Sequence, residues 1–446
     1  MAKSRQKRTV LWSVLIFSAL FLIIGGGFHK RLVAGTDETY EELKIFTDVL
    51  DIVEKNYVDT VDSKELIRGA IKGMLGSLDP HSSYLLPDDY KELQIDTHGE
   101  FGGLGIVITK VEGVITVISP IEGTPAFGAG IEAGDKIIKV DGANTKDMAL
   151  EEAVKKMRGP KGTKVTITII REGLEKPKDF SITRDIIPLK SVRSFSLKDG
   201  YGYIRITNFR DKTTEDLEKA LSKLESEKVP MRGLVLDLRH NPGGLLDQAI
   251  KVADLFLEDG TIVSIKGRIK AHNKTYTAHP DKEKRTYPII VLINGGSASA
   301  AEIVAGALQD HGRALILGTS SFGKGSVQAI EPMRDGSGLK LTIARYYTPS
   351  GNSIQARGII PDIEVKVREI SGEKEEKHIK EKDLKNHIES DNDIETPESD
   401  TVSDDNDKDT KAAETLLAKD NQVMEALQIL TSWDIFSKMS QQATGK

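Results

Sequence analysis

The stretch that decides the fold begins Tyr287-Pro-Ile-Ile-Val-Leu-Ile293 and continues directly as Asn294-Gly-Gly-Ser-Ala-Ser299-Ala-Ala-Glu302. Its first part is a short apolar run rich in β-branched residues, which predicts a fully buried strand. Its second part is a turn of small residues that opens a helical run to Asp310. Because backbone can approach a ligand closely where side chains are small, this turn is a candidate place for a nucleophile.

Ser299 has two interpretations. As a helix N-cap, it forms a Ser-x-x-Glu capping box with Glu302. As a nucleophile, it has a helix N-terminus and the amide of Ala300 to hold negative charge, and it needs a separate base. The two interpretations are compatible, since a serine at the start of a helix can still react.

Lys324 is the candidate base. It lies between two glycines after the apolar run 314–318, where burial would lower its pKa from the ordinary lysine value of about 10.4 toward neutrality. Gln328, four residues later, is placed to hydrogen-bond the neutral amine and orient it. None of the nine histidines stands in a recognisable nucleophile-elbow or triad context.

The stretch Gly318-Thr-Ser-Ser-Phe-Gly323-Lys324 matches the first seven positions of a phosphate-binding loop. The next position should be Ser or Thr to hold magnesium, but it is Gly325. The continuation Val327–Pro332 does not have the pattern of a helix that would cradle phosphate. The sequence therefore argues against a nucleotide site.

Four stretches, which follow one another along the chain in the order typical of the family, resemble the C-terminal processing peptidases, also called tail-specific proteases, over about residues 40 to 365. One is the Ser299 turn, which is followed along the chain by Lys324 and Gln328. Another is the strand and turn Leu236-Asp-Leu-Arg-His-Asn-Pro-Gly-Gly244. The other two are Leu78-Asp-Pro-His-Ser-Ser-Tyr-Leu85 and the segment Tyr347–Gln355 running into Gly358–Glu364.

The resemblance implies a serine protease with a Ser-Lys dyad assisted by Gln, that is, Ser299, Lys324 and Gln328. It also selects Ser299 over the neighbouring Ser297. Backbone amides of Gly243, Gly244 and Ala300 would form the oxyanion hole; the alternative for Asn241–Gly244 is a tight turn feeding a helix over 245–256. The implied fold is α/β, a crotonase/ClpP-like layered core with an inserted PDZ domain and N- and C-terminal helical segments.

Residues 96–185 resemble a PDZ domain. The loop Phe101-Gly-Gly-Leu-Gly-Ile106 would bind a peptide carboxylate, and the strand that begins at Ile106 would pair with the peptide. The peptide-binding residues implied are Gly103, Leu104, Gly105 and Ile106. The alternative is a hairpin turn whose apolar side chains are ordinary core.

The chain divides by composition and pattern into six segments. Residues 1–35 hold a basic end and an uncharged run, 36–95 are helical, 96–185 are the PDZ domain and 186–365 the peptidase core. Residues 366–411 read as a disordered charged linker, and 412–446 as a helical segment that docks on this chain or on another. The core should alternate strands and helices, with strands at 201–206, 233–238 and 339–346 and helices at 213–228 and 245–256.

Composition limits the function. The chain has 446 residues, a net charge of −6 and no cysteine, which excludes disulfides, thiolate catalysis and cysteine metal sites. The net charge gives no reason to expect nucleic acid. No cofactor and no metal is implied.

Four basic residues precede the uncharged run Val10–Phe28, and His29-Lys30-Arg31 follow it. This pattern indicates an uncleaved single-pass anchor in the cell membrane, with cleavage as a secretory signal as the alternative. In both cases the catalytic part lies outside the cytoplasm, on the periplasmic or cell-wall side.

The sequence therefore predicts an envelope serine endopeptidase that takes protein C-terminal tails through its PDZ domain. A membrane-tethered PDZ module with an inactive peptidase core is the alternative, and a crotonase-type acyl-transfer enzyme, which would need a coenzyme A site that no feature specifies, is a third. The pattern leaves open whether the chain forms a homo-oligomer and whether it needs an activator protein.

Overall fold

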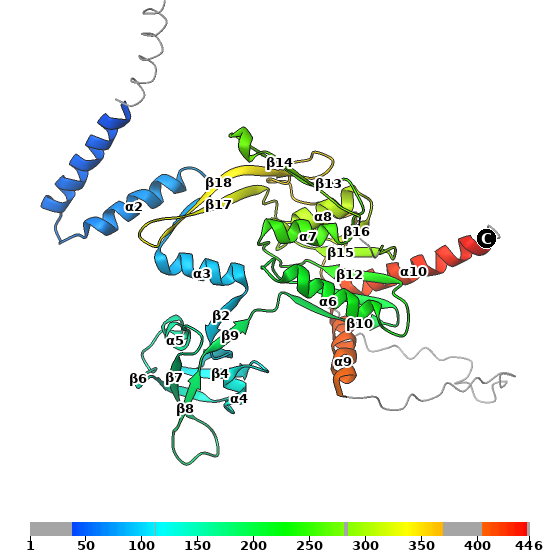
Figure 1. Cartoon of the computed structure of the whole chain (residues 1–446), viewed down its shortest axis with the longest axis horizontal. Coiled ribbons are helices and arrows are strands. Elements are labelled where there is room, and N and C mark those ends of the chain that lie inside the picture. Colours follow the sequence, from blue (N-terminus) through cyan, green and yellow to red (C-terminus); the bar gives the residue numbers. More distant parts are fainter. Residues whose placement is uncertain (1–37, 112, 281–283, 369–403, 444–446) are drawn as a thin grey trace, which may run out of the picture. The chain divides into compact units, whose positions relative to one another are not determined.

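The computed structural model describes residues 38–111, 113–280, 284–368 and 404–443 (Figure 1). They fall into two compact units, which divide between Tyr84 and Leu85. In the first unit, residues 38–56 are helical and α2 spans Ser63–Gly76. The Asp62 side chain caps α2 by accepting from the amide of Lys64 at 2.8 Å. The predicted anchor and most of the predicted charged linker lie outside the described residues.

The centre of the second unit is a sheet in the order β10-β11-β12-β15-β16-β19. β10 pairs antiparallel with β11, and the remaining pairs are parallel. Parallel neighbours need crossover connections; α6, α7 and α8 lie in three of them, and the connection from β16 to β19 contains β17 and β18. The strands are β10 (Val192–Lys198), β11 (Tyr201–Ile206), β12 (Gly233–Asp237), β15 (Ile289–Ile293), β16 (Ala314–Gly318) and β19 (Ile363–Glu364); the helices are α6 (Thr213–Glu225), α7 (Leu246–Asp254) and α8 (Ala300–Asp310).

Alternate residues of the central strands face opposite sides of this sheet, as the period of a strand requires. One face packs on α6, α7 and α8 and carries Leu234, Leu236, Ile289, Val291 and Ile293. All five of these side chains are at most 2% exposed. The predicted strands and helices of the core are thereby confirmed, to within a few residues at their ends.

The other face of the same sheet is covered by the C-terminal helical segment. Val235 and Ile290 share a buried cluster with Val423 and Leu430 of α10, and Figure 1 shows α10, in red, beside β12. The terminal segment therefore docks on its own chain. It consists of α9 (Asp404–Lys419) and α10 (Asn421–Ala443); α9 begins inside the stretch 366–411 that the sequence assigns to a linker.

A second sheet lies on the other side of α7 and α8. It contains β17, β18, β13 and β14, each paired antiparallel with its neighbour. β13 and β18 contribute Val263, Ile265, Ala344 and Tyr346 to the core around α8. The strands are β13 (Thr261–Gly267), β14 (Lys274–Thr277), β17 (Ser326–Pro332) and β18 (Gly338–Tyr347), with a short 3₁₀ turn, η1, at Lys270–His272.

Residues 100–188 form a separate small domain with its own apolar core. Its main sheet has the order β3-β4-β5-β7-β8, β6 pairs with β5, and β2 pairs with β9. The strands are β2 (Glu100–Gly103), β3 (Ile106–Val111), β4 (Val114–Pro120), β5 (Lys136–Val140), β6 (Ala143–Asn144), β7 (Lys164–Ile170), β8 (Lys178–Thr183) and β9 (Asp185–Pro188); the helices are α4 (Pro125–Gly128) and α5 (Leu150–Met157).

Helix α3 (Pro87–His98) precedes this small domain. Its acidic side chains pair with both neighbours: Asp88 binds Lys155 of α5 at 2.8 Å, and Asp96 binds Arg210, between β11 and α6, at 2.9 Å. These are contacts of exposed side chains, which contribute little free energy.

Candidate active site

Ser299 occupies the sharp turn between β15 and α8. It is 9% exposed and has φ of 54° and ψ of −112°, a combination that costs a non-glycine residue about 1–3 kcal/mol. An ordinary N-cap residue has extended backbone with negative φ. The turn is therefore strained in a way that a helix cap alone does not require, although the predicted capping box with Glu302 is present as well.

Ser297 is fully buried, and its hydroxyl is fully engaged. It donates to the carbonyl of Leu238 at 2.8 Å and accepts from the amide of Asn294 at 3.0 Å. These bonds tie the start of the turn to the end of β12. Ser297 is therefore a structural residue, whose hydroxyl holds the turn against β12.

Glu302 joins the two halves of the predicted dyad. Its Oε2 accepts from the amides of Ser299 at 2.8 Å and Lys324 at 2.9 Å, and its Oε1 accepts from Gly323 N and the Ser321 hydroxyl, each at 2.6 Å. Burial raises the pKa of Glu302, against the effect of these four hydrogen bonds. Three of the four partners are backbone amides, so both oxygens of Glu302 act as acceptors.

Lys324 is half-buried between β16 and β17. Burial lowers the pKa of its amine below the usual 10.5, and the positive charge of Lys340 lowers it further, while the Glu302 carboxylate opposes the shift. Its Nζ makes no hydrogen bond or ion pair within the described part of the chain. An amine in such surroundings gives up its proton more readily than a free lysine, as a general base requires.

Tyr346 of β18 lies next to both candidate residues. Its amide donates to the carbonyl of Gly325, beside Lys324, at 2.7 Å. Burial raises the pKa of its phenol to about 12, and the neighbouring side chain of Ser299 opposes the rise. Tyr346 is thus a site residue that the sequence analysis did not single out.

Gln328 does not reach Lys324 in this structure. Its side-chain amide donates to the hydroxyl of Ser326 at 2.8 Å and, with long bonds, to the Ser326 carbonyl and the Thr342 hydroxyl. An irregularity in the pairing of β17 with β18 falls between Val327 and Gln328. The structure therefore brings Ser299 and Lys324 to one carboxylate but leaves Gln328 bound to Ser326.

The loop 239–244 passes beside Ser299. A Cβ added to Gly243 would lie 2.8 Å from the Cβ of Ser299 and 3.0 Å from the amide nitrogen of Ala300. The amide of Gly243 donates to the Asn241 side chain at 2.9 Å, whereas those of Gly244 and Ala300 make no hydrogen bond among the residues described here. The amides of Gly244 and Ala300 are therefore free to donate, and Gly243 brings this loop against Ser299.

The predicted carboxylate-binding loop of the small domain connects β2 to β3. Gly105 has φ of 78°, and a Cβ there would lie 2.3 Å from the side chain of Thr124, so the loop requires glycine. The carbonyls of Leu104 and Gly105 accept from Ala126 and Ile121, but their amides have no partner in the described ranges. Gly103 and Ile106 end and begin the flanking strands.

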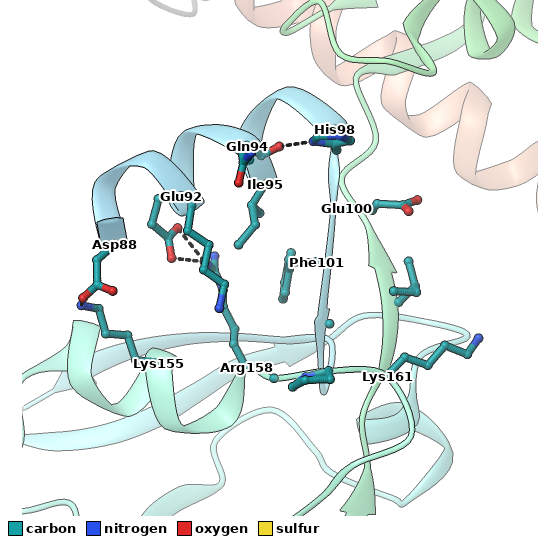
Figure 2. A pocket seen from close by; sticks show the side chains of 15 residues that line it. Asp88, Glu92, Gln94, Ile95, His98, Glu100, Phe101, Lys155, Arg158 and Lys161 are labelled. Atoms are coloured by element: carbon teal, nitrogen blue, oxygen red, sulfur yellow. Dashed lines mark hydrogen bonds and ion pairs between the residues drawn. The ribbon is translucent and has the colours of Figure 1, made fainter. Parts of the chain in front are cut away.

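A cavity of about 650 Å³ lies between α3, β2 and the end of α5, and neither Ser299 nor Lys324 lines it. Figure 2 shows Arg158 reaching across it to Glu92, with bonds of 2.7 and 2.8 Å. The guanidinium lies 4.5 Å from the centre of the Phe101 ring. Lys91, Lys155 and Lys161 and the acidic Asp88 and Glu100 also line the cavity, so its charges are mixed.

Within the described ranges, no helix is both long enough and apolar enough to span a bilayer. The uncharged run 10–28, on which the membrane anchor was predicted, lies outside those ranges.

Three family models match the chain. Peptidase family S41 matches residues 200–365, the PDZ domain 92–170, and the N-terminal domain of the activating protease CtpB 29–88. The peptidase match contains Ser299, Lys324 and the loop 239–244, and the PDZ match contains the loop 103–106.

Several curated proteins are similar over most of the chain. A carboxy-terminal-processing protease of Bartonella bacilliformis is 52% identical over 330 residues, covering 73% of this chain and 76% of that protein. The carboxy-terminal processing protease CtpA of Bacillus subtilis is 37% identical over 362 residues, covering 80% and 76%. Among solved structures, a photosystem II D1 C-terminal processing protease has 31% identity and a TM-score of 0.42, covering 72% of this chain and 92% of that one. The chain therefore belongs to peptidase family S41, the carboxy-terminal processing serine proteases, and carries a PDZ domain.

Proposed function

We propose that this protease cleaves peptide bonds with a dyad of Ser299 and Lys324 and that its PDZ domain captures the C-terminal tails of its protein substrates. One observation carries the proposal. The amides of Ser299 and Lys324 bind the same oxygen of the buried Glu302, so residues from two separate loops are held at one point.

In the first step, neutral Lys324 takes the proton of the Ser299 hydroxyl as the oxygen attacks the scissile carbonyl carbon. The lowered pKa of Lys324 favours this neutral form. The protonated amine then gives its proton to the departing amine of the substrate, which leaves an acyl-enzyme on Ser299.

The negative oxygen of the tetrahedral intermediate would be stabilised by the amides of Gly244 and Ala300, which lack other partners. Gly243 would support this hole through its contact with Ser299. Loss of one such donor costs about 100- to 1000-fold in kcat in other serine proteases. Water then attacks the acyl group, with Lys324 again as base, and frees the enzyme.

Gln328 would assist only after its side chain leaves Ser326. The bonds to Ser326 hold it away from the amine in this conformation. We propose that substrate binding frees Gln328 to orient Lys324. The Ser326→Ala variant removes the shortest of those bonds and should then raise the rate of peptide cleavage when no tail is bound to the PDZ domain. The Gln328→Ala variant should lower the rate of peptide cleavage.

The PDZ domain would bind a tail by its terminal carboxylate. The amides of Leu104 and Gly105 are available for that group, and β3 presents an edge that an extended peptide can join. The same loop could bind a tail whether or not the peptidase core is active, because tail binding does not depend on Ser299. It is therefore also consistent with the alternative of a PDZ module with an inactive core.

The proposal places the catalytic part outside the cytoplasm, anchored by the basic and uncharged segments at the N-terminus. Exposure of the PDZ domain to an added protease in intact cells, compared with permeabilised cells, tests this placement. If the added protease digests the PDZ domain only after the cell membrane has been permeabilised, the proposed placement is wrong.

Cleavage of an unfolded protein with an apolar C-terminal tail tests the function. Wild type should cut it, and folded Ser299→Ala and Lys324→Ala should not. A chain that binds a terminal peptide but neither cuts nor reacts with a serine-directed probe would instead be a binding module.

A further inference from the structure

Arg239 stands at the start of the loop that carries Gly243 and Gly244, and its side chain faces away from Ser299. It is 7% exposed and folds back onto Asp237, the last residue of β12. Nε and Nη2 donate to the two oxygens of Asp237 at 2.9 and 2.6 Å. Asp237 also accepts from its own loop through the amide of Arg239 at 2.9 Å.

The remaining donors of Arg239 are taken by the start of α10, which is distant in sequence. Nη1 and Nη2 donate to the oxygens of Asp420 at 3.0 and 2.7 Å, and Nη1 also donates to Gln422 at 2.7 Å. Every N–H of the guanidinium therefore has a partner, and three of the five bonds come from the C-terminal segment. A planar guanidinium held at both edges has a fixed orientation.

The loop beyond Arg239 is also bonded to β11 and to the segment after it, through Asn241 Nδ2 on the Ile206 carbonyl at 2.8 Å and the Phe209 amide on the Gly243 carbonyl at 2.9 Å. His240 has φ of 56° and is held by Asn294, which accepts from its amide at 2.9 Å. Asn241 then accepts from the amides of Ala298 and Gly243, each at 2.9 Å. Hydrogen bonds and the covalent backbone of the loop thus connect Asp420, through Arg239 and Asn241, to Ala298, the residue before Ser299.

We propose that Asp420 and Gln422 are positioning residues for peptide hydrolysis: α10 fixes Arg239, and Arg239 fixes the loop whose Gly244 amide stabilises the oxyanion. The C-terminal segment is then part of the catalytic machinery as well as a cover for the sheet. This inference rests on the proposed Ser299–Lys324 function. It predicts a specific loss in kcat, because small misplacements of groups that act on the transition state are costly.

The test is Asp420→Asn in the full chain, with Asp434→Asn as its matched control. Asp420 immediately precedes α10 and Asp434 lies on it, and both side chains are 20% exposed, but Asp434 binds Lys438 and approaches Arg232 instead of Arg239. Asp420→Asn should lower kcat by about tenfold or more while KM stays within about twofold. Asp434→Asn should leave kcat and KM unchanged, even if it lowers the thermal stability as much as Asp420→Asn does.

Unchanged kcat in folded Asp420→Asn, or an equal loss in Asp434→Asn, would overturn the inference while leaving the dyad in place. If wild type itself shows no Ser299-dependent cleavage, the proposed function fails and this inference fails with it. Should Asp420→Asn not fold, Gln422→Met decides in the same assay. It removes one acceptor of Arg239 and keeps the side-chain volume, so a kcat fall of several-fold at constant KM supports the inference and an unchanged kcat overturns it.

Discussion

The backbone of Ser299 has a positive φ, which residues other than glycine rarely adopt. A glycine would relieve the strain, since it reaches positive φ without a Cβ penalty. The positive φ, the close approach of Gly243 and the hydrogen bond from the Ser299 amide to Glu302 together fix the backbone that carries the hydroxyl. Strain of this kind is common at catalytic residues.

Comparing Ser299→Gly with Ser299→Ala tests whether this strain is real. Both variants should be inactive, but Ser299→Gly should have the higher free energy of unfolding, by about 1–3 kcal/mol. Chemical denaturation of the two variants measures the difference. Equal stabilities would mean that the φ of 54° costs nothing.

In the proposed mechanism, the pKa of Lys324 sets the acidic side of the pH profile of kcat/KM. Because its folded-state pKa is lowered from 10.5, the neutral base appears at a lower pH than for a free lysine. kcat/KM should therefore rise as pH increases through that lowered pKa and then level off.

Lys340→Met shows whether Lys324 is the titrating group. Lys340 lowers the pKa of Lys324 by its positive charge, so its removal should raise that pKa and shift the acidic limb toward higher pH. Lys274→Met, at an exposed position on β14, serves as the control and should leave the limb in place. A limb that does not move in Lys340→Met argues against Lys324 as the base.

At the scale of elements, the start of α8 is organised by one buried carboxylate that accepts from two loops. The capping half of this arrangement follows from the Ser-x-x-Glu spacing alone. The bonds to Ser321, Gly323 and Lys324 do not, because they join residues whose proximity depends on how β16 and β17 meet α8. The Ser-x-x-Glu spacing can therefore predict where α8 starts, but it cannot predict that Glu302 also binds Ser321, Gly323 and Lys324.

Glu302→Gln should disrupt this arrangement although it keeps the volume. All four partners of Glu302 are donors, so the new NH₂ group must face one pair of them. We expect the free energy of unfolding to fall by about 1–3 kcal/mol and activity to fall with it. Glu331→Gln, at an exposed position of β17, should change neither; a stable, fully active Glu302→Gln would contradict this account.

The elements themselves were largely predictable, since β11 matches the predicted range 201–206 and β12 ends one residue before the predicted end at 238. The reason is that strands and helices each have a local pattern of apolar residues, which alternate in a strand and recur every three to four residues in a helix. The pairing of Arg239 with Asp420 could not be predicted, because it joins residues 181 apart and leaves no local pattern. α9 was missed at its start for a related reason: its acidic first turns, favourable at a helix N-terminus, look like a solvated linker.

For the whole molecule, the decisive feature is that both faces of the central sheet are buried. Three crossover helices cover one face and α10 covers the other. A sheet of parallel strands needs both covers. The C-terminal segment is therefore an integral layer of the protease core.

Leu430→Ala measures the contribution of that layer. Leu430 of α10 packs on the sheet and is 1% exposed, whereas Trp433, on the same helix, is 62% exposed. Leu430→Ala should lower the free energy of unfolding by about 2–5 kcal/mol, whereas Trp433→Ala should have an effect within about 0.5 kcal/mol. A similar effect of both substitutions on thermal unfolding would mean that α10 does not pack on the sheet as described.

The central claim is that Ser299 is the nucleophile and Lys324 its base, and mass mapping of a fluorophosphonate adduct tests it most directly. The account predicts an adduct on Ser299 in the wild type, none in Ser299→Ala, and strongly slowed labelling in folded Lys324→Met. An adduct on Ser297, or labelling of Lys324→Met at the wild-type rate, would contradict the account.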